Sequence, residues 1–252
     1  MKIITFANEP FKRIALNWAK HIEALDIENY LVYALDEETY IFLREHEINT
    51  ELKDDIWSPT EENPGWIDRF EFVYSLLKSG EDILQSDIDA IWLKNPLEFI
   101  TESCDIVGSI GDKLSKDIAR RIGVMPICMG WTYFKSNENV LNLYNTVIQR
   151  WYNKTLINDK GLTLTKFCDQ RALNIVLFEN LKKKDINHCE NGIKCCESKG
   201  VRVRLLPETI IRRGKYLEIK PYVDHYKISW SSRSVPKDRE MLLKDMGLWI
   251  LD

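Results

Sequence analysis

The sequence predicts an α/β protein in which helices flank a mostly parallel central sheet. Apolar runs of strand length alternate with segments whose apolar residues recur at helical spacing, which is typical of parallel sheets covered by helices. The run at 30–35 is apolar throughout, as in strands buried on both faces. Two carboxylates, Asp87 and Asp89, follow a short apolar strand, and ligands of such sheets bind beyond the carboxyl ends of strands.

Composition is that of an ordinary globular protein. The 252 residues are 44% apolar and 29% charged, enough for one large domain or two small ones. The 35 basic and 39 acidic residues give a net charge of −4, which favours neither nucleic acid nor an anionic membrane as a partner. The chain shows no internal repeat and no linker, so we expect a single domain over residues 1–252.

The same inventory bears on location. The longest uncharged stretch near the middle, at 122–134, is too short to span a bilayer. The N-terminus enters a strand directly, without the apolar region of a signal peptide. We therefore expect a soluble, cytoplasmic protein.

The first third of the chain reads as alternating strands and helices. Strands are expected at 1–7, 30–35 and 83–84, and helices at 11–25, 37–46 and 66–79. Asn63 and Pro64 suit the N-cap and first turn of the third helix, and Gly80 ends it. Residues 48–62 are polar and are expected to be irregular.

The remaining chain continues the pattern. Strands are expected at 104–110, 127–134 and 201–206, and helices begin at Asn137, between 166 and 169, and near Pro236. A charged connection is expected at 111–123, and Gly247 closes the last helix. Within the aromatic strand at 127–134, Gly130 allows close approach of another backbone or a ligand. Residues 182–200 are expected to form a variable insertion loop.

Four soft ligands gather in that insertion: His188, Cys189, Cys195 and Cys196. A structural zinc ion is conceivable, but this spacing matches none of the usual zinc patterns. A loop that carries a disulfide, or one that is simply reduced, fits the spacing better.

The Asp87–Ile88–Asp89 stretch is the strongest chemical signal. In an extended chain, residues two apart share a face, so both carboxylates project together while Ile88 points into the core. Two such carboxylates repel each other unless a proton or a cation lies between them. Hard divalent cations such as Mg²⁺ or Mn²⁺ take carboxylate oxygens and leave places for phosphates. A solvated turn that bears two acids is the plain alternative.

The residues around these acids resemble the nucleotide-diphospho-sugar transferases of the GT-A fold. Ser86–Pro96 reads S-D-I-D-A-I-W-L-K-N-P, which is similar to the family form S-D-x-D-x-x-W-L-x-x-P. Residues 168–174, C-D-Q-R-A-L-N, resemble the family segment D-Q-x-x-(F/L)-N. The segments 5–8, 17–18, 31–36 and 203–207, and His225 near the end, match in the same order.

This resemblance implies a metal-dependent glycosyltransferase whose donor is a nucleotide-diphosphate sugar, with UDP favoured and GDP as the alternative. Asp89 and His225, with Asp87 directly or through water, would hold Mn²⁺ or Mg²⁺ on the diphosphate. The acceptor would be a hydroxyl of a glycan or another molecule. The residues that the resemblance places at the donor are Phe6, Asn8, Arg69, Asp87, Ile88 and Asp89.

Individual roles follow in the same way. Phe6 and Asn8 would border the base and ribose, and Arg69 would approach the diphosphate or the sugar. As an alternative, Arg69 is an ordinary exposed arginine beside Asp68. Asp169 and Gln170 would line the sugar face and are the catalytic candidates, although Asp169 also suits a helix cap. Lys227 or Arg233 would reach a phosphate.

One departure from the family concerns residues 128–130. Many members have Asn-(Ser/Thr/Ala)-Gly where this chain has Cys128-Met129-Gly130, which puts transfer of their donor preference in doubt. A non-catalytic nucleotide-sugar-binding or scaffold protein of the same fold is therefore the alternative. A nucleotidyltransferase would need a glycine-rich phosphate loop after the first strand, and Phe6–Pro10 has no glycine. An Asp-x-Asp phosphatase fits less well, since its nucleophile ends the first strand.

Overall fold

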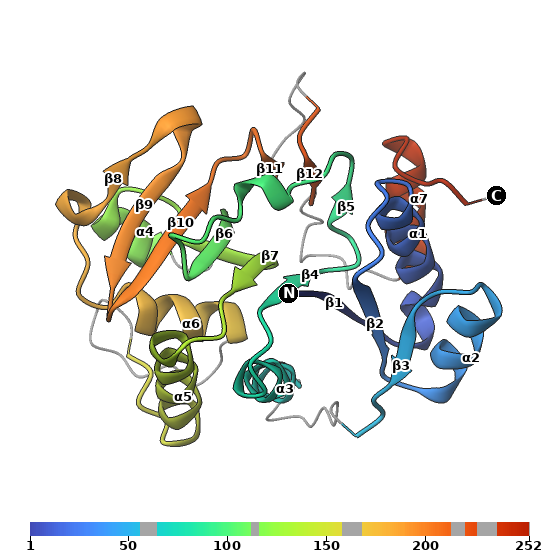
Figure 1. Cartoon of the computed structure of the whole chain (residues 1–252), viewed down its shortest axis with the longest axis horizontal. Helices are drawn as coiled ribbons and strands as arrows, with labels where there is room; N and C mark the ends of the chain where they lie inside the picture. Colours follow the sequence, from blue (N-terminus) through green and yellow to red (C-terminus); the bar gives the residue numbers. More distant parts are fainter. Residues whose placement is uncertain (56–64, 112–115, 158–167, 213–219, 226–235, 252) are drawn as a thin grey trace.

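A computed structural model of the chain describes residues 1–55, 65–111, 116–157, 168–212, 220–225 and 236–251 (Figure 1). The strands of its main sheet lie in the order β3 (Thr50–Leu52), β2 (Tyr30–Ala34), β1 (Lys2–Ala7), β4 (Ile83–Ser86), β7 (Ile127–Phe134), β6 (Ile106–Ile110), β10 (Val201–Leu206), β9 (Lys194–Ser198) and β8 (Asn187–His188). A small sheet joins β11 (Ile211–Arg212), β12 (Val223–Asp224) and β5 (Ile91–Trp92). The helices are α1 (Lys12–Glu23), α2 (Glu37–Glu45), α3 (Trp66–Lys78), α4 (Lys116–Ile122), α5 (Glu138–Tyr152), α6 (Asp169–Leu177) and α7 (Pro236–Asp245).

The expected α/β class with a large sheet and flanking helices is confirmed. Strands β3, β2, β1 and β4 are parallel, as the alternation of strands and helices predicts. Strand β7 runs antiparallel to both β4 and β6, and of the neighbouring pairs in the sheet four are parallel and four antiparallel. The sheet is therefore mixed rather than mostly parallel, because its second half contains antiparallel strands that periodicity cannot orient.

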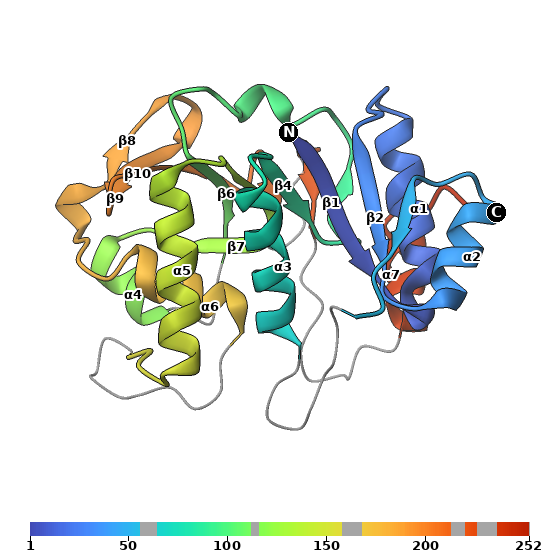
Figure 2. The ribbon, with the colours of Figure 1, turned by 60° about the horizontal axis from the view of Figure 1, so that its bottom comes forward.

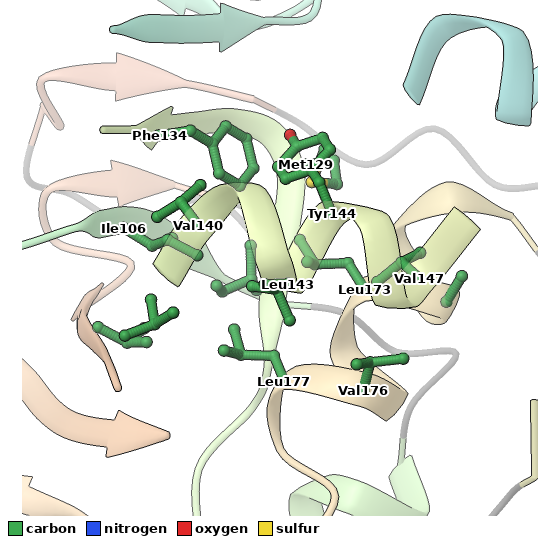
Figure 3. Close-up of a cluster of buried hydrophobic side chains, with 14 of the residues drawn as sticks. Ile106, Met129, Phe134, Val140, Leu143, Tyr144, Val147, Leu173, Val176 and Leu177 are labelled. Atoms are coloured by element: carbon green, nitrogen blue, oxygen red, sulfur yellow. The ribbon is translucent and has the colours of Figure 1, made fainter. Parts of the chain in front are cut away.

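Two hydrophobic cores lie on the two faces of the sheet. Residues of β1 divide between them, with Ile4 in the core under α3, α5 and α6 and Ile3 in the core under α1. Figure 2 shows α3, α5 and α6 together over one face, and Figure 3 shows Phe134 and Tyr144 packed within that core. The division follows from the period of two along a strand.

Strand β7 changes phase in the middle. Ile127 and Met129 belong to the core under α5 and α6, whereas Trp131 and Tyr133 belong to the core on the other face. The pairing with β6 shifts at the same place, since Ser109 pairs with Cys128 but Gly108 pairs with Thr132. This is a β-bulge, which re-aims side chains and frees main-chain groups.

Several expected elements differ in detail. The polar stretch after Ile48 contains β3, which main-chain pairing with β2 holds at the sheet edge. The expected connection at 111–123 contains α4, whose Ile118 and Ile122 are buried four residues apart. Such elements depend on tertiary contacts more than on local propensity. Asn63 and Pro64 lie outside the described residues, and Gly65 precedes α3.

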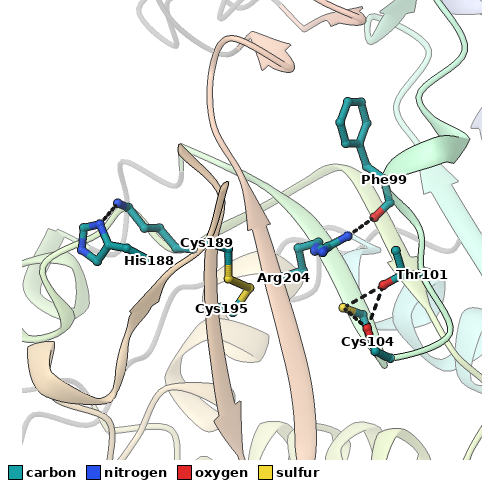
Figure 4. The surroundings of a disulfide bond; sticks show 9 residues. Phe99, Thr101, Cys104, His188, Cys189, Cys195 and Arg204 are labelled. Carbon is teal, nitrogen blue, oxygen red and sulfur yellow. Dashed lines mark hydrogen bonds between the residues drawn. A yellow bond between two sulfur atoms is a disulfide. The ribbon is translucent and has the colours of Figure 1, made fainter. Parts of the chain in front are cut away.

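The expected loop at 182–200 is wrong as a description of its structure. Strands β8 and β9 form a hairpin there, and β9 pairs antiparallel with β10 to extend the sheet. Figure 4 shows the Cys189–Cys195 disulfide in this hairpin, so two of the four soft ligands are paired with each other. The disulfide alternative is the one that the structure contains. The single domain and the role of this segment as a family insertion stay predictions.

Among the described helices, none combines the length and the apolar character that crossing a membrane requires. The longest of those that face the core, α5, has one buried stripe formed by Val140, Leu143, Tyr144 and Val147. Asn137 caps this helix as expected, accepting the Val140 N–H at 3.0 Å.

Candidate functional site

The Asp-x-Asp stretch lies in a turn at the end of β4. The strand ends at Ser86, and the Ala90 N–H donates to the Asp87 carbonyl at 2.9 Å. The extended conformation that we expected is therefore replaced by a turn. Ile88 is 7% exposed and packs in the core, as expected. The turn still brings the two carboxylates together.

Two tryptophans fix this turn from beneath. The Ser86 hydroxyl accepts the indole N–H of Trp18 and that of Trp92, each at 3.2 Å. All three side chains are buried. The serine and tryptophan of the S-D-x-D-x-x-W motif thus serve to hold the strand end in place, and the aspartates are left to face the site.

The motif also positions His225. Directly after the turn, β5 pairs antiparallel with β12, with Trp92 opposite Val223 and Ile91 opposite Asp224. The next residue along β12 therefore returns beside Asp89. The His225 N–H donates to the Arg212 carbonyl at 2.9 Å, and Arg212 forms a buried bidentate ion pair with Asp224.

The bulge of β7 makes room for the histidine ring. A Cβ at residue 130 would lie within 3.0 Å of three ring atoms of His225. Gly130 is not among the glycines with positive φ in the described backbone, so this contact alone excludes a side chain there. The expected close approach at Gly130 is confirmed, and its partner is His225. The Asp87 N–H donates to the Gly130 carbonyl at 2.9 Å.

The three side chains converge on one volume. The His225 Nε2 atom lies 3.2 Å from Asp89 Oδ1 and 3.7 Å from Asp87 Oδ2. One ligand atom from each residue lies within 4.8 Å of the others, the spacing of a group that could hold a metal ion. The His225 side chain is 3% exposed and Asp87 is 34% exposed, so the site opens on the Asp87 side. Two carboxylates and an imidazole suit a divalent cation that keeps places for phosphate oxygens.

Two arginines contact the carboxylates from different directions. Arg69 of α3 lies 3.4 Å from Asp87 and also pairs with Asp169, with Nε at 3.1 Å from Oδ2. Burial lowers the pKa of the Arg69 guanidinium, but Asp169 and Asp87 outweigh it and raise the pKa overall. Arg239 of α7 lies 3.0 Å from Asp89 Oδ2. Arg69 is therefore no ordinary surface arginine.

Helix α6 contacts the bulge through the conserved-looking D-Q-x-x-L-N segment. Gln170 accepts the Met129 N–H at 2.9 Å, and Asn174 accepts the Ile127 N–H at 3.1 Å. These residues lie four apart on a helix and two apart on a strand, so one face meets the other. Asp169 is almost completely buried; its Oδ1 accepts the Gln170 N–H at 2.7 Å, and its Oδ2 binds Arg69. The structure thus brings both catalytic candidates beside the acids.

Phe6 and Asn8 lie at the carboxyl end of β1. Phe6 is partly buried and stacks on Tyr33 at 5.6 Å between ring centroids, with Phe72 at its edge. Asn8 is partly exposed just before α1. These positions border the site as expected, while contact with a nucleoside stays a proposal.

Cys128, the departure from the family pattern, is 1% exposed and lies behind His225, with Sγ 3.9 Å from Nδ1. A side chain at this position reaches the metal ligand before it reaches an open cleft. Lys227 and Arg233 lie outside the described residues. Arg239 was missed, because it lies 150 residues from Asp89 in a charged segment with no motif.

Comparison with solved structures agrees with this architecture. A galactosyltransferase, LgtC, in complex with donor and acceptor sugar analogues superposes with a TM-score of 0.53 at 13% identity, covering 100% of this chain and 97% of that chain. At this identity the likeness establishes the fold alone, and the fold is the expected GT-A glycosyltransferase fold.

Curated relatives are more similar in sequence. The arabinosyltransferase XEG113 of Arabidopsis thaliana is 25% identical over 94% of this chain, and the UDP-galactose:fucoside alpha-3-galactosyltransferase of Dictyostelium discoideum is 23% identical over 100%. The chain spans 38% and 43% of the lengths of these relatives. A family model of nucleotide-diphospho-sugar transferases matches residues 25–230, well over half of the sequence. The chain belongs to the nucleotide-diphospho-sugar transferase family.

Proposed function

We propose that this chain is a metal-dependent glycosyltransferase domain that transfers a sugar from a nucleotide-diphosphate sugar to a hydroxyl acceptor. The observation that carries the proposal is the convergence of Asp87, Asp89 and His225, three potential ligands from distant parts of the chain. Family membership supports a nucleotide-sugar donor. Both named relatives are glycosyltransferases, one arabinosyl and one galactosyl, so a pentose and a hexose are both compatible.

For the nucleotide we propose UDP. The name of the Dictyostelium relative includes UDP-galactose, which favours a uridine donor over GDP. Phe6 and Asn8 would border the base and ribose at the end of β1, beside the two acids that follow β4, the neighbouring strand. For the ion we propose Mn²⁺ over Mg²⁺, because an imidazole nitrogen is a better ligand for first-row transition ions.

The residues then divide the work of the reaction. A bound divalent ion would neutralise charge on the nucleoside diphosphate as it leaves. The acceptor oxygen forms a bond to the anomeric carbon while the bond from that carbon to the diphosphate breaks, and the acceptor proton passes to a base. Asp169 holds Arg69 beside Asp87 and contributes fixed negative charge near the sugar. Gln170 holds the bulge and lines the same side. Inversion or retention is left open by this arrangement.

The nucleotide site is tested by titrating UDP and GDP, each with and without Mn²⁺, by calorimetry. We expect UDP to bind only with Mn²⁺. The D89N variant should lose more than the roughly 10- to 100-fold that follows loss of a residue merely supporting a ligand. Asp245, exposed on α7, provides the matched control D245N, which should bind as the native chain does. Metal-independent UDP binding, or unchanged binding by D89N, would contradict the proposal.

The room for His225 is tested by G130A. The added methyl group must displace the His225 ring, so we expect Mn²⁺ affinity measured by titration to fall at least about tenfold. The control is G108A, which places a methyl group in the adjacent strand against Ile127 instead. Circular dichroism checks that both variants remain folded. Native Mn²⁺ affinity in a folded G130A protein would show that His225 is not a ligand.

The role of Asp169 is tested by D169N. The amide keeps the shape but removes the charge that holds Arg69, so we expect hydrolysis or transfer of a UDP-sugar to slow at least about tenfold. Affinity for UDP with Mn²⁺ should stay within about twofold, because Asp169 does not contact the ion site. Equal loss of UDP affinity and turnover would assign Asp169 to donor binding. A donor that is neither transferred nor hydrolysed by the native chain would favour the non-catalytic alternative.

A further inference from the structure

We propose that Arg239 pairs with Asp89 when no metal is bound and with the donor diphosphate once the metal has arrived. The inference rests on the proposed function and deepens it, since it assigns a residue of α7 to the phosphate subsite. It also makes metal and nucleotide binding depend on each other.

The first support is how the Asp89 carboxylate is shared. Its Oδ1 atom faces the His225 Nε2 at 3.2 Å, and its Oδ2 atom faces the Arg239 Nη1 at 3.0 Å. Both side chains of the Arg239–Asp89 pair are mostly buried, at 26% and 14% exposure. The guanidinium therefore supplies positive charge at the carboxylate where a divalent ion would bring its own.

The second support is where Arg239 lies relative to the donor. Its guanidinium carbon is 5.4 Å from the centre of the Phe11 ring, three residues after Asn8. The cation is thus placed between the segment expected at the nucleoside and the metal ligand Asp89. Arg69 lies on the other flank, where it joins Asp87 to Asp169 and the sugar side. A diphosphate that links a nucleoside to a sugar must run between these two arginines.

Charge balance makes the exchange necessary. Without metal, Asp87 and Asp89 are each matched by one guanidinium. A divalent ion adds two positive charges, and at about 4 Å each unit pair repels by about 4 kcal/mol at an effective dielectric constant of 20. The diphosphate brings compensating negative charge and oxygen atoms that suit a bidentate guanidinium. Arg239 is then free to leave Asp89 for the phosphate.

Helix α7 has its own attachments, so the exchange needs only the Arg239 side chain to move. Glu240 pairs with Arg13 of α1 at 3.1 Å and with Lys244 at 2.7 Å. Lys244 also lies 5.3 Å from the centre of the Trp249 ring. These contacts lie on the same helix and none of them involves Asp89, which makes Lys244 a matched control.

The test measures two affinities in R239Q and in K244Q: Mn²⁺ alone, from the spin-resonance signal of the free ion, and UDP at saturating Mn²⁺, by calorimetry. We expect R239Q to bind Mn²⁺ alone at least about threefold more tightly, because a competing cation is gone. Its UDP affinity should fall about 10- to 100-fold, the range for a hydrogen bond to a charged group. K244Q should match the native chain in both affinities.

The opposite signs of the two effects are what a merely structural role would not produce. R239K, which keeps the charge but not the fork, should retain native Mn²⁺ affinity and still bind UDP more weakly. If R239Q weakens both affinities, or changes neither while the native chain binds normally, the exchange is wrong and the metal site stands. If the native chain and K244Q bind neither Mn²⁺ nor UDP, the proposed function fails together with this inference.

Discussion

The site depends on the missing Cβ at residue 130. The bulge in β7 turns the strand at this residue, and the His225 ring occupies the space that any side chain would need. The main-chain groups that the bulge exposes are met individually, with Gln170 on the Met129 N–H and Gln85 on its carbonyl at 3.3 Å. An unmet buried group of this kind costs about 1–3 kcal/mol. The polar residues around the bulge therefore hold open the space into which the histidine fits.

Electrostatics explains why the two acids can share so small a volume. Unit charges of like sign about 4 Å apart repel by about 4 kcal/mol at an effective dielectric constant of 20. In this structure each carboxylate has its own guanidinium, Arg69 for Asp87 and Arg239 for Asp89. The arginines come from α3 and α7, which carry opposite flanks of the proposed donor site. The cluster is thus prepared for an exchange of cations, and its net charge depends on which of them is present.

The sequence alone could predict what is encoded locally. Asp87 and Asp89 stand in a motif of consecutive residues, and its serine and tryptophan turn out to fix the turn through Ser86. His225 could be proposed only through the family resemblance, because its neighbours in space lie more than 90 residues away. Arg239 had no signal at all, since exposed and functional arginines look alike in a charged helix. Strand β3 and the hairpin of β8 and β9 were missed because pairing with neighbouring strands, not composition, makes them strands.

The most direct measurement is X-ray diffraction from crystals grown with MnCl₂ and UDP, collected at the manganese absorption edge. The account predicts one strong anomalous peak at coordination distance from Asp89 Oδ and His225 Nε2, with the diphosphate oxygens on its open side. It also predicts that the Gly130 backbone stays against the histidine ring. Bound UDP with no anomalous peak at these residues, or a peak held by other side chains, would contradict it.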